Sequence, residues 1–406
     1  MAVTPAPSEL VSESTPSARR AEILRNSIAP FLRFFTGAYA ELSPDPSVAN
    51  FAVGNPHELA MPSYVRAVRD SIEPHDKDWF AYKLSEPESQ RVVAGTMSRL
   101  TGLEWDPLDV QMTNGGFAAL AIAFRTLLGA TDEAIFLSAP WFFYEQLILA
   151  ADATPVRVRL EMPNWHLDLA AISDAITART RVLILNSPHN PSGRIVTPDD
   201  LRALAELLTR KSNENGRPIY LVSDEPYRRI VFDGREYHSP AEFYPNTVVT
   251  YSYGKQLLAP GMRIGYLTWP PNMPDRERVR DDAFITQFAS GFMFPNADLQ
   301  HALADLEPLC IDLKALERRR ARLVGALRGM GYEATWPEGT FYVMARSPLA
   351  DDEAFTAILN RHRVLVLPGT IVETPGWFRI SLTASDEMVD KGILGFRAAR
   401  EEAGTD

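Results

Sequence analysis

The chain has 406 residues, and its 46% hydrophobic content is sufficient for a large core and for two or three domains. Its formal charge of −11 disfavours nucleic acid and anionic membranes as partners. The single cysteine, Cys310, excludes a disulfide within the chain and is typical of a reducing cytosol. We therefore expect a cytoplasmic protein with neither a nucleic-acid nor a membrane partner.

The N-terminal segment divides into two parts. Residues 1–18 are rich in Pro, Ser and Ala and lack the order of a signal peptide, so we predict a flexible tail. Residues 19–48 are partly helical, and we expect this arm to join the smaller domain described below. The arm contains a dense apolar cluster made of Ile28, Pro30, Phe31, Leu32, Phe34 and Phe35. If exposed, this cluster would mark a subunit interface; alternatively it packs on its own domain.

The middle of the chain alternates helical and strand patterns. Short apolar runs predict buried strands at 133–140, 181–188, 218–225 and 247–253. Amphipathic helices are predicted at 114–129 and 199–211. This alternation predicts an α/β domain with a mostly parallel sheet, which we place at residues 49–295. Ligands of such sheets bind beyond the carboxyl ends of the strands.

From residue 296 to 406 the pattern favours a smaller α+β domain. A long charged helix is predicted over 312–330, and strands over 339–346 and 376–382, with a helical stretch between them. We expect four arginines of the long helix to form a solvated face rather than a polyanion site, namely Arg318, Arg319, Arg320 and Arg322.

Polar residues of unusual type follow three of the predicted strands. Asn190-Pro191 indicates a turn after the first strand. Asp224 ends an apolar run, where a carboxylate needs a compensating partner such as a cationic ring nitrogen. Lys255 follows the third strand, and a poorly solvated lysine becomes a nucleophile suited to Schiff-base formation. Taken singly, Asn190-Pro191 fits an ordinary turn, Asp224 fits a helix cap or a salt bridge, and Lys255 fits a surface charge.

The spacing of these residues forms a longer pattern. Asn190-Pro191-x-Gly193, Asp224-x-x-Tyr227, Ser252-x-x-Lys255 and then Arg263 together resemble the signature of class I/II aminotransferases. That resemblance covers about residues 30–400. It implies a pyridoxal 5′-phosphate (PLP) enzyme of fold type I, with a large domain built on a mostly parallel sheet and a smaller α+β domain. It also implies an aminotransferase that acts on an α-amino acid and a 2-oxo acid as a homodimer.

The resemblance assigns roles to individual residues. Lys255 would carry the cofactor as a Schiff base and act as general base, and Asp224 would pair with the pyridine nitrogen. Asn190 and Tyr227 resemble the donors to the phenolic oxygen of the cofactor. The residues that resemble phosphate ligands are Gly115, Gly116, Phe117, Ser252, Arg263 and, from a neighbouring subunit, Tyr82. A glycine-rich turn at a helix N-terminus is independently suited to bind an anion.

The remaining assignments concern the cofactor ring and the substrate. Phe142 resembles the aromatic residue that stacks on the pyridine, with Trp141 as the alternative. Arg379 and Gly54, with Asn190, resemble the groups that bind the substrate α-carboxylate, for which the arginine fork is well suited. The sequence offers no second arginine for a dicarboxylate side chain, and we expect no metal site.

Two other interpretations use the same cofactor. The same kind of site supports elimination or replacement at the β or γ carbon, cyclisation as in aminocyclopropane-carboxylate-type synthases, and oxidation of amino acids. A PLP-sensing regulator would need an N-terminal DNA-binding domain, for which residues 1–29 are too short. We therefore take transamination as the prediction and the other reactions of the amino acid α-carbon as its alternatives.

Overall fold

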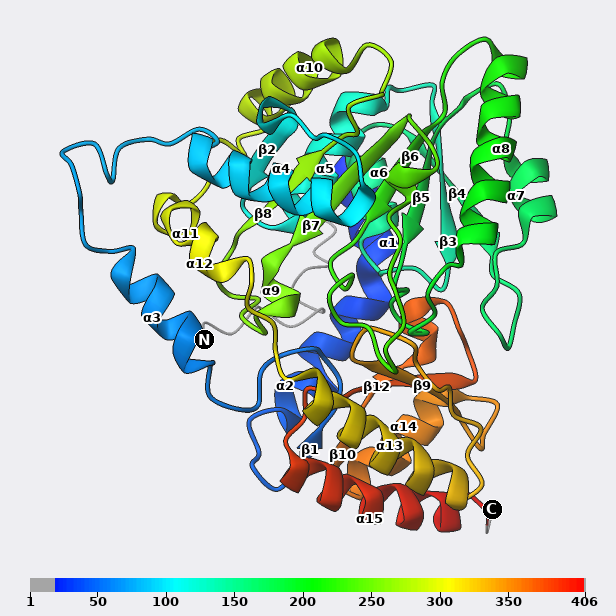
Figure 1. Ribbon diagram of the computed structural model, residues 1–406. Coiled ribbons are helices and arrows are strands. Elements are labelled where there is room, and N and C mark those ends of the chain that lie inside the picture. Colours follow the sequence, from blue (N-terminus) through cyan, green and yellow to red (C-terminus); the bar gives the residue numbers. More distant parts are fainter. Residues whose placement is uncertain (1–18, 405–406) are drawn as a thin grey trace.

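A computed structural model describes residues 19–404, so the predicted tail over residues 1–18 lies outside the described residues. The chain folds into a large domain around a central sheet and a smaller domain beside it, the upper and lower parts of Figure 1. Among residues 19–404 no helix has the length and apolar character to cross a membrane.

The central sheet has seven strands in the order β2-β8-β7-β6-β5-β3-β4. Their bounds are β2 Val110–Thr113, β3 Glu133–Ser138, β4 Thr154–Arg159, β5 Thr180–Asn186, β6 Tyr220–Asp224, β7 Thr247–Ser252 and β8 Gly265–Thr268. Within this sheet, β8 runs opposite to the other six strands. The prediction of a mostly parallel sheet is confirmed, and β3, β5, β6 and β7 fall on the four predicted strands.

Helices cover both faces of the sheet because alternate strand residues point to opposite sides. In β3, Ala134 and Phe136 pack with one layer, whereas Ile135 and Leu137 pack with the other. The first layer consists of α5 (Gly116–Leu127), α6 (Tyr144–Ala150) and α10 (Arg276–Ala289). The second contains α4 (Pro87–Thr101), α7 (Leu169–Ala175) and α8 (Pro198–Asn215).

The small domain is a three-stranded antiparallel sheet covered by helices. Its strands, in the order β11-β12-β9, are Leu367–Pro368, Trp377–Ser381 and Tyr342–Arg346. Its helices are α13 (Leu313–Gly329), α14 (Asp352–Arg361) and α15 (Asp386–Ala403). Asp312, Asp351 and Ser385 cap these helices by accepting a backbone N–H, which explains where each begins.

The domain boundaries differ from those predicted. Strand β1 (Ala49–Asn50) pairs with β10 (Val364–Leu365), so the chain just after residue 48 belongs to the small domain. Helices α11 (Ala297–His301) and α12 (Leu303–Leu306) contribute to the same core as α4, so the large domain extends past residue 295. Helix α3 (Pro62–Asp70) and residues 71–86 project from the side of the molecule (Figure 1).

The N-terminal arm contacts more than the small domain. It consists of α1 (Arg19–Thr36) and α2 (Ala38–Leu42), and α1 passes behind the junction of the two domains (Figure 1). The Phe31 ring lies 4.6 Å from that of Phe142 in the large domain, between ring centroids. Phe34 and Phe35 pack against a core that includes residues of both domains. Phe31, Phe34 and Phe35 therefore pack within their own chain, while all six residues of the cluster stay partly exposed.

Two of the four arginines predicted to form a solvated face of α13 differ from expectation, whereas Arg318 and Arg322 are exposed as predicted. Arg319 and Arg320 are buried rather than solvated. Arg319 forms ion pairs with Glu58 and Asp386, and Arg320 pairs with Asp233. A buried guanidinium needs such partners, which lie 67 to 261 residues away in the sequence and cannot be recognised from the helix alone.

Candidate active site

A cavity of about 200 Å³ lies beyond the carboxyl ends of β5, β6 and β7, at the N-terminus of α5. Eight of the residues predicted from the sequence line it, namely Gly116, Phe117, Asn190, Asp224, Tyr227, Ser252, Lys255 and Arg263. Parallel strands bring their carboxyl ends to one edge of the sheet, so residues scattered from 116 to 263 meet in one place.

Asp224 is a buried carboxylate that is hydrogen-bonded by neutral groups. The hydroxyl of Tyr144 donates to its Oδ2 at 2.5 Å, and that of Thr250 donates to its Oδ1 at 3.3 Å. Burial raises the pKa of Asp224 to about 6, although these hydrogen bonds and the charge of Lys255 oppose the shift. A cation entering the cavity would therefore find an acceptor whose charge is poorly compensated.

Sheet register explains why these residues meet. Asn186 in β5, Asp224 in β6 and Thr250 in β7 lie side by side across three strands. The amide of Asn186 donates to the backbone oxygen of Asp224 at 2.7 Å and accepts from the N–H of Asn190 at 2.7 Å. Sequence reasoning missed Asn186, Tyr144 and Thr250, because their roles depend on cross-strand neighbours.

A cradle for an anion forms where α5 begins. A Cβ added at Gly115 would lie 2.7 Å from Nη2 of Arg263, and one at Gly116 would lie 3.2 Å from Cβ of Ser252. Both glycines leave room for these side chains, and the positive φ of 85° at Gly115 favours glycine there. The free N–H groups of a helix N-terminus, a hydroxyl and a guanidinium thus converge, which is the donor set that a phosphate requires.

The amine of Lys255 lies between two aromatic rings. Lys255 belongs to the short helix α9 (Tyr253–Gln256), directly after β7. Its Nζ is 5.8 Å from the ring centroid of Tyr227 and 5.9 Å from that of Phe341. Burial raises the pKa of Tyr227 well above its usual value, and the neighbouring Tyr342 adds to that shift. Tyr227 is therefore a neutral hydroxyl beside the lysine, able to donate a hydrogen bond.

Arg379 and Gly54 meet at a second polar point near Asn190. Arg379 is buried in β12; its Nη1 donates to Oδ1 of Asn190 at 3.0 Å and its Nη2 to the Ala52 oxygen at 3.2 Å. Its Nε is buried and meets no partner within the part of the chain that the structure describes. A buried donor of this kind is costly unless a ligand accepts from it.

Tyr342 is a residue that sequence reasoning missed at this point. Its ring lies 4.0 Å from the guanidinium carbon of Arg379, and its hydroxyl accepts the N–H of Gly54. Burial alone would raise the pKa of Tyr342, but the charges of Arg379 and Lys255 and the hydrogen bonds from Tyr227 and Gly54 together leave that pKa lowered. A Cβ on Gly54 would lie 2.3 Å from the Phe341 ring, so this approach requires glycine.

Two predicted residues lie elsewhere. Trp141 lines the cavity, whereas Phe142 packs against Phe31 of α1 and does not line it; which ring stacks on the cofactor stays a prediction. The segment after β3 is irregular, and only tertiary packing decides which of its rings turns inward. Tyr82 lies on the projecting segment with 86% of its surface exposed and contacts Phe294, outside the cavity of its own chain.

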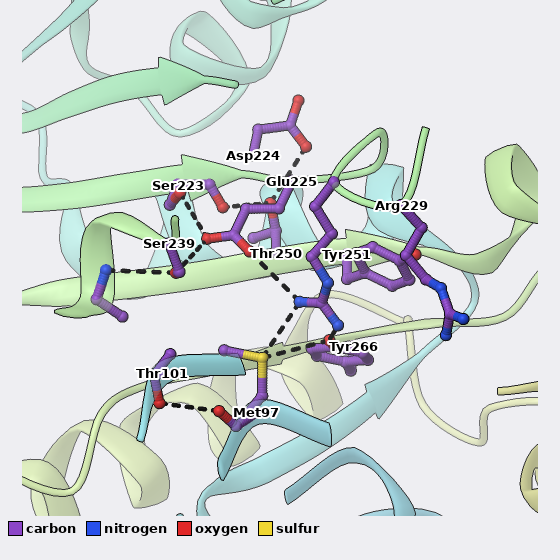
Figure 2. Close-up of polar contacts among 12 residues, drawn as sticks. Met97, Thr101, Ser223, Asp224, Glu225, Arg229, Ser239, Thr250, Tyr251 and Tyr266 are labelled. Carbon is purple, nitrogen blue, oxygen red and sulfur yellow. Dashed lines mark hydrogen bonds and ion pairs between the residues drawn. The ribbon is translucent and has the colours of Figure 1, made fainter. Parts of the chain in front are cut away.

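Beneath the cavity, a second buried carboxylate holds the chain after β6. The side chains of Asp224 and Glu225 point in opposite directions, and Glu225 accepts from Ser223 at 2.9 Å and from Ser239 at 2.6 Å (Figure 2). Arg228 completes this network with an ion pair to Glu225 at 3.3 Å. The network fixes the backbone from which Asp224 and Tyr227 project.

Comparison with known proteins places the chain among similar enzymes. Residues 46–394 match the family model for aminotransferase class I and II. The aspartate/prephenate aminotransferase of Thermus thermophilus is 30% identical, over 82% of this chain and 86% of that protein. A crystal structure of an amino transferase from Eubacterium rectale superposes with a TM-score of 0.85, at 28% identity, over 99% of both chains. The Thermus thermophilus aspartate aminotransferase with maleate gives a TM-score of 0.80, at 26% identity, over 95% and 100%.

Proposed function

The chain belongs to the class I and II aminotransferase family, and from this premise we propose that Lys255 is the lysine that holds PLP through a Schiff base. The protein is a PLP-dependent aminotransferase that moves an amino group between an α-amino acid and a 2-oxo acid. The observation that carries the assignment is the meeting of Lys255, the uncompensated carboxylate of Asp224 and the anion cradle in one cavity.

The residues of the cavity fit the cofactor group by group. The N-terminus of α5 with Gly116, Ser252 and Arg263 would hold the phosphate. Asp224 would accept a hydrogen bond from the pyridinium, and Asn190 and Tyr227 would donate to the phenolic oxygen. Trp141, rather than Phe142, would contact the ring face. When bound, PLP supplies an electron sink for the pair left at the amino acid α-carbon.

The side chains around the cofactor would supply proton transfer and substrate binding. The amine of Lys255 would take the proton from the substrate α-carbon as a general base and deliver it to C4′ of the cofactor as a general acid. Arg379 would hold the α-carboxylate through the Nε that now lacks a partner, which fixes the α-carbon near Lys255. The rings of Tyr227 and Phe341 would flank the lysine amine on its apolar side.

We also propose that the active form is a cytoplasmic homodimer. The projecting segment exposes apolar side chains, including Ile72, Phe80, Tyr82 and Leu84, and such patches commonly mark interfaces. Tyr82 would then reach the phosphate of the partner's site. Mixing inactive Tyr82→Ala with inactive Lys255→Ala tests this, because a hybrid dimer regains one intact site only if Tyr82 acts across the boundary. If light scattering finds only monomer in a preparation that is fully active, the proposed dimer is contradicted.

Product analysis tests the reaction itself. Purified holoenzyme is mixed with single amino acids, and the pyridoxamine phosphate absorbance is followed together with the released product. An oxo acid formed in step with pyridoxamine phosphate supports transamination by this site. Ammonia, a cyclised product or oxygen consumption would favour the alternative reactions. Lys255→Ala should remove both signals, whereas Lys314→Ala, which changes an exposed lysine of α13, should keep them.

A further inference from the structure

A second cavity, of about 270 Å³, lies between the two domains and apart from the candidate active site. The large domain lines it with Arg194, which follows β5, and with Trp165 from the segment that links β4 to α7. The small domain lines it with Arg328 of α13, with the segment after that helix, and with Trp377 of β12. Among the described residues, none lines both this cavity and the one around Lys255. We call this space the interdomain cavity.

Indole rings form the apolar part of its lining, namely those of Trp165, Trp336 and Trp377. Trp165 and Trp377 are buried and meet edge to face, with ring centroids 6.1 Å apart. Trp336 keeps 42% of its surface exposed, and the guanidinium carbon of Arg320 lies 4.3 Å from its ring centroid. Rigid rings that are held by packed neighbours in a cavity of this size suit a small, flat ligand.

Trp165 is a strained residue whose polar atom has no partner. Its φ is 60°, a left-handed conformation that is rare for a bulky side chain. Its Nε1–H is buried and meets no acceptor within the part of the chain that the structure describes. A buried donor without an acceptor costs free energy, and strained residues are frequent at ligand sites. A ligand oxygen in the cavity would supply the missing acceptor.

The charged side chains of the lining leave one cation without a counterion. Arg328 donates to the backbone oxygen of Ala334 and forms no ion pair with any described residue. The acidic residues of the lining are already paired with arginines, in the ion pairs Glu338–Arg194, Glu338–Arg235 and Glu333–Arg346. The arginines around the cavity therefore outnumber the carboxylates, and a ligand carboxylate would find its charge partner in Arg328.

We propose that the interdomain cavity is a second ligand site, and that it takes a small aromatic carboxylate. The ring of the ligand would lie among the indole rings. Its carboxylate would pair with Arg328, with the Nε1–H of Trp165 as a further donor. Because both domains line the cavity, the ligand would bridge them. This inference stands apart from the role proposed for Lys255 and does not rest on it.

Calorimetric titration of the holoenzyme with phenylacetate tests the site, because this probe has neither an amino nor an oxo group to react. We expect saturable binding that Arg328→Gln weakens roughly 10- to 100-fold, the effect of losing a hydrogen bond between charged groups. Trp165→Phe keeps a ring but removes the N–H, and should weaken binding about tenfold. Arg318→Gln changes an exposed arginine of the same helix outside the cavity and should leave the Kd unchanged.

Two results of this titration would overturn the inference. One is the absence of saturable binding to the wild-type holoenzyme. The other is a Kd that is the same in wild type, Arg328→Gln and Trp165→Phe, which would place phenylacetate elsewhere, for example at Arg379. The PLP absorbance of each variant shows whether the cofactor site is intact, so a failure of the proposed function is seen separately.

Fragments of the probe test the ligand class. Benzyl alcohol keeps the ring without the carboxylate, and acetate keeps the carboxylate without the ring. Each should bind at least about tenfold more weakly than phenylacetate, because each lacks one of the two sets of contacts. Acetate that binds as tightly as phenylacetate would show that the rings recognise nothing. Equally tight binding of benzyl alcohol would show that Arg328 recognises no carboxylate, and either result would overturn the assigned class.

Discussion

Asp224 and Glu225 are adjacent carboxylates, both buried, that lie in two different surroundings. Glu225 meets a cation inside the protein, since Arg228 pairs with it and is held in turn by the Tyr266 hydroxyl at 2.6 Å and over the Tyr251 ring at 4.1 Å. Asp224 is hydrogen-bonded by neutral hydroxyls and faces the cavity. Burial raises the pKa of both groups. The comparison shows that a buried carboxylate paired with a cation inside the protein stabilises the fold. A buried carboxylate without such a partner can bind a cationic ligand instead.

The largest effect on stability is expected for the buried ion pair of Glu225 and Arg228. Arg228→Leu leaves Glu225 buried without its cation, so the free energy of unfolding should fall by roughly 3–5 kcal/mol. Urea denaturation of the cofactor-free protein measures it. The double variant Glu225→Leu/Arg228→Leu should recover most of the loss, because it removes the charge as well as its partner. Equal losses in the single and double variants would mean that shape, and not charge, governs this network.

Substitution of Asp224, which faces the cavity, should lower activity without lowering stability. Asp224→Ala should slow exchange of the substrate α-proton roughly 100- to 1000-fold, the effect of losing one preorganised electrostatic group. The variant should still bind PLP, and its thermal midpoint should not fall, because a poorly compensated buried charge has been removed. Deuterium exchange followed by NMR gives the rate. Near-normal exchange would show that another residue keeps the ring protonated.

The pH dependence of stability separates the two carboxylates further. The pKa of Asp224 is about 6 in the folded chain and near 3.8 when unfolded, so its favourable contribution is complete below pH 3.8 and is lost as the pH rises through 6. For a shift of this size the loss is about 3 kcal/mol. In cofactor-free protein, wild type should therefore lose stability between pH 4 and 7 relative to Asp224→Asn. Parallel curves for the two proteins would contradict the raised pKa.

The smallest effect is expected on the pH dependence of PLP binding when the Tyr144 hydroxyl, which donates to Asp224, is removed. Tyr144→Phe removes a hydrogen bond that lowers the pKa of Asp224, so that pKa should rise further. We expect the pH midpoint for PLP binding to move up by about one unit, as the loss of one hydrogen bond to a charged group predicts. Thr250→Val removes the longer bond and should move the midpoint less. A downward shift in Tyr144→Phe would contradict the assigned role.

Much of this architecture was predictable from local pattern. The short apolar runs at β3, β5, β6 and β7 and the amphipathic periods of α5, α8 and α13 specify these elements without tertiary information. Topology then brings the polar residues after those strands to one edge, which explains why the residues predicted around Lys255 line one cavity.

The rest depends on contacts between distant segments. Asn186 and Thr250 join the site through strand register, and Tyr144 reaches Asp224 across 80 residues of sequence. Trp141 rather than Phe142 lines the cavity, because Phe142 packs against Phe31 of α1. Nothing in a local period encodes which ring of an irregular segment turns inward.

Borohydride reduction of the holoenzyme tests the central claim most directly. The reduced protein is digested, and the peptide that carries the pyridoxyl group is sequenced by mass spectrometry. We predict a single modified lysine, Lys255, and loss of the adduct in Lys255→Ala. A pyridoxyl adduct on another lysine of active wild-type enzyme, or an adduct that persists in Lys255→Ala, would contradict the assignment of this cavity as the active site.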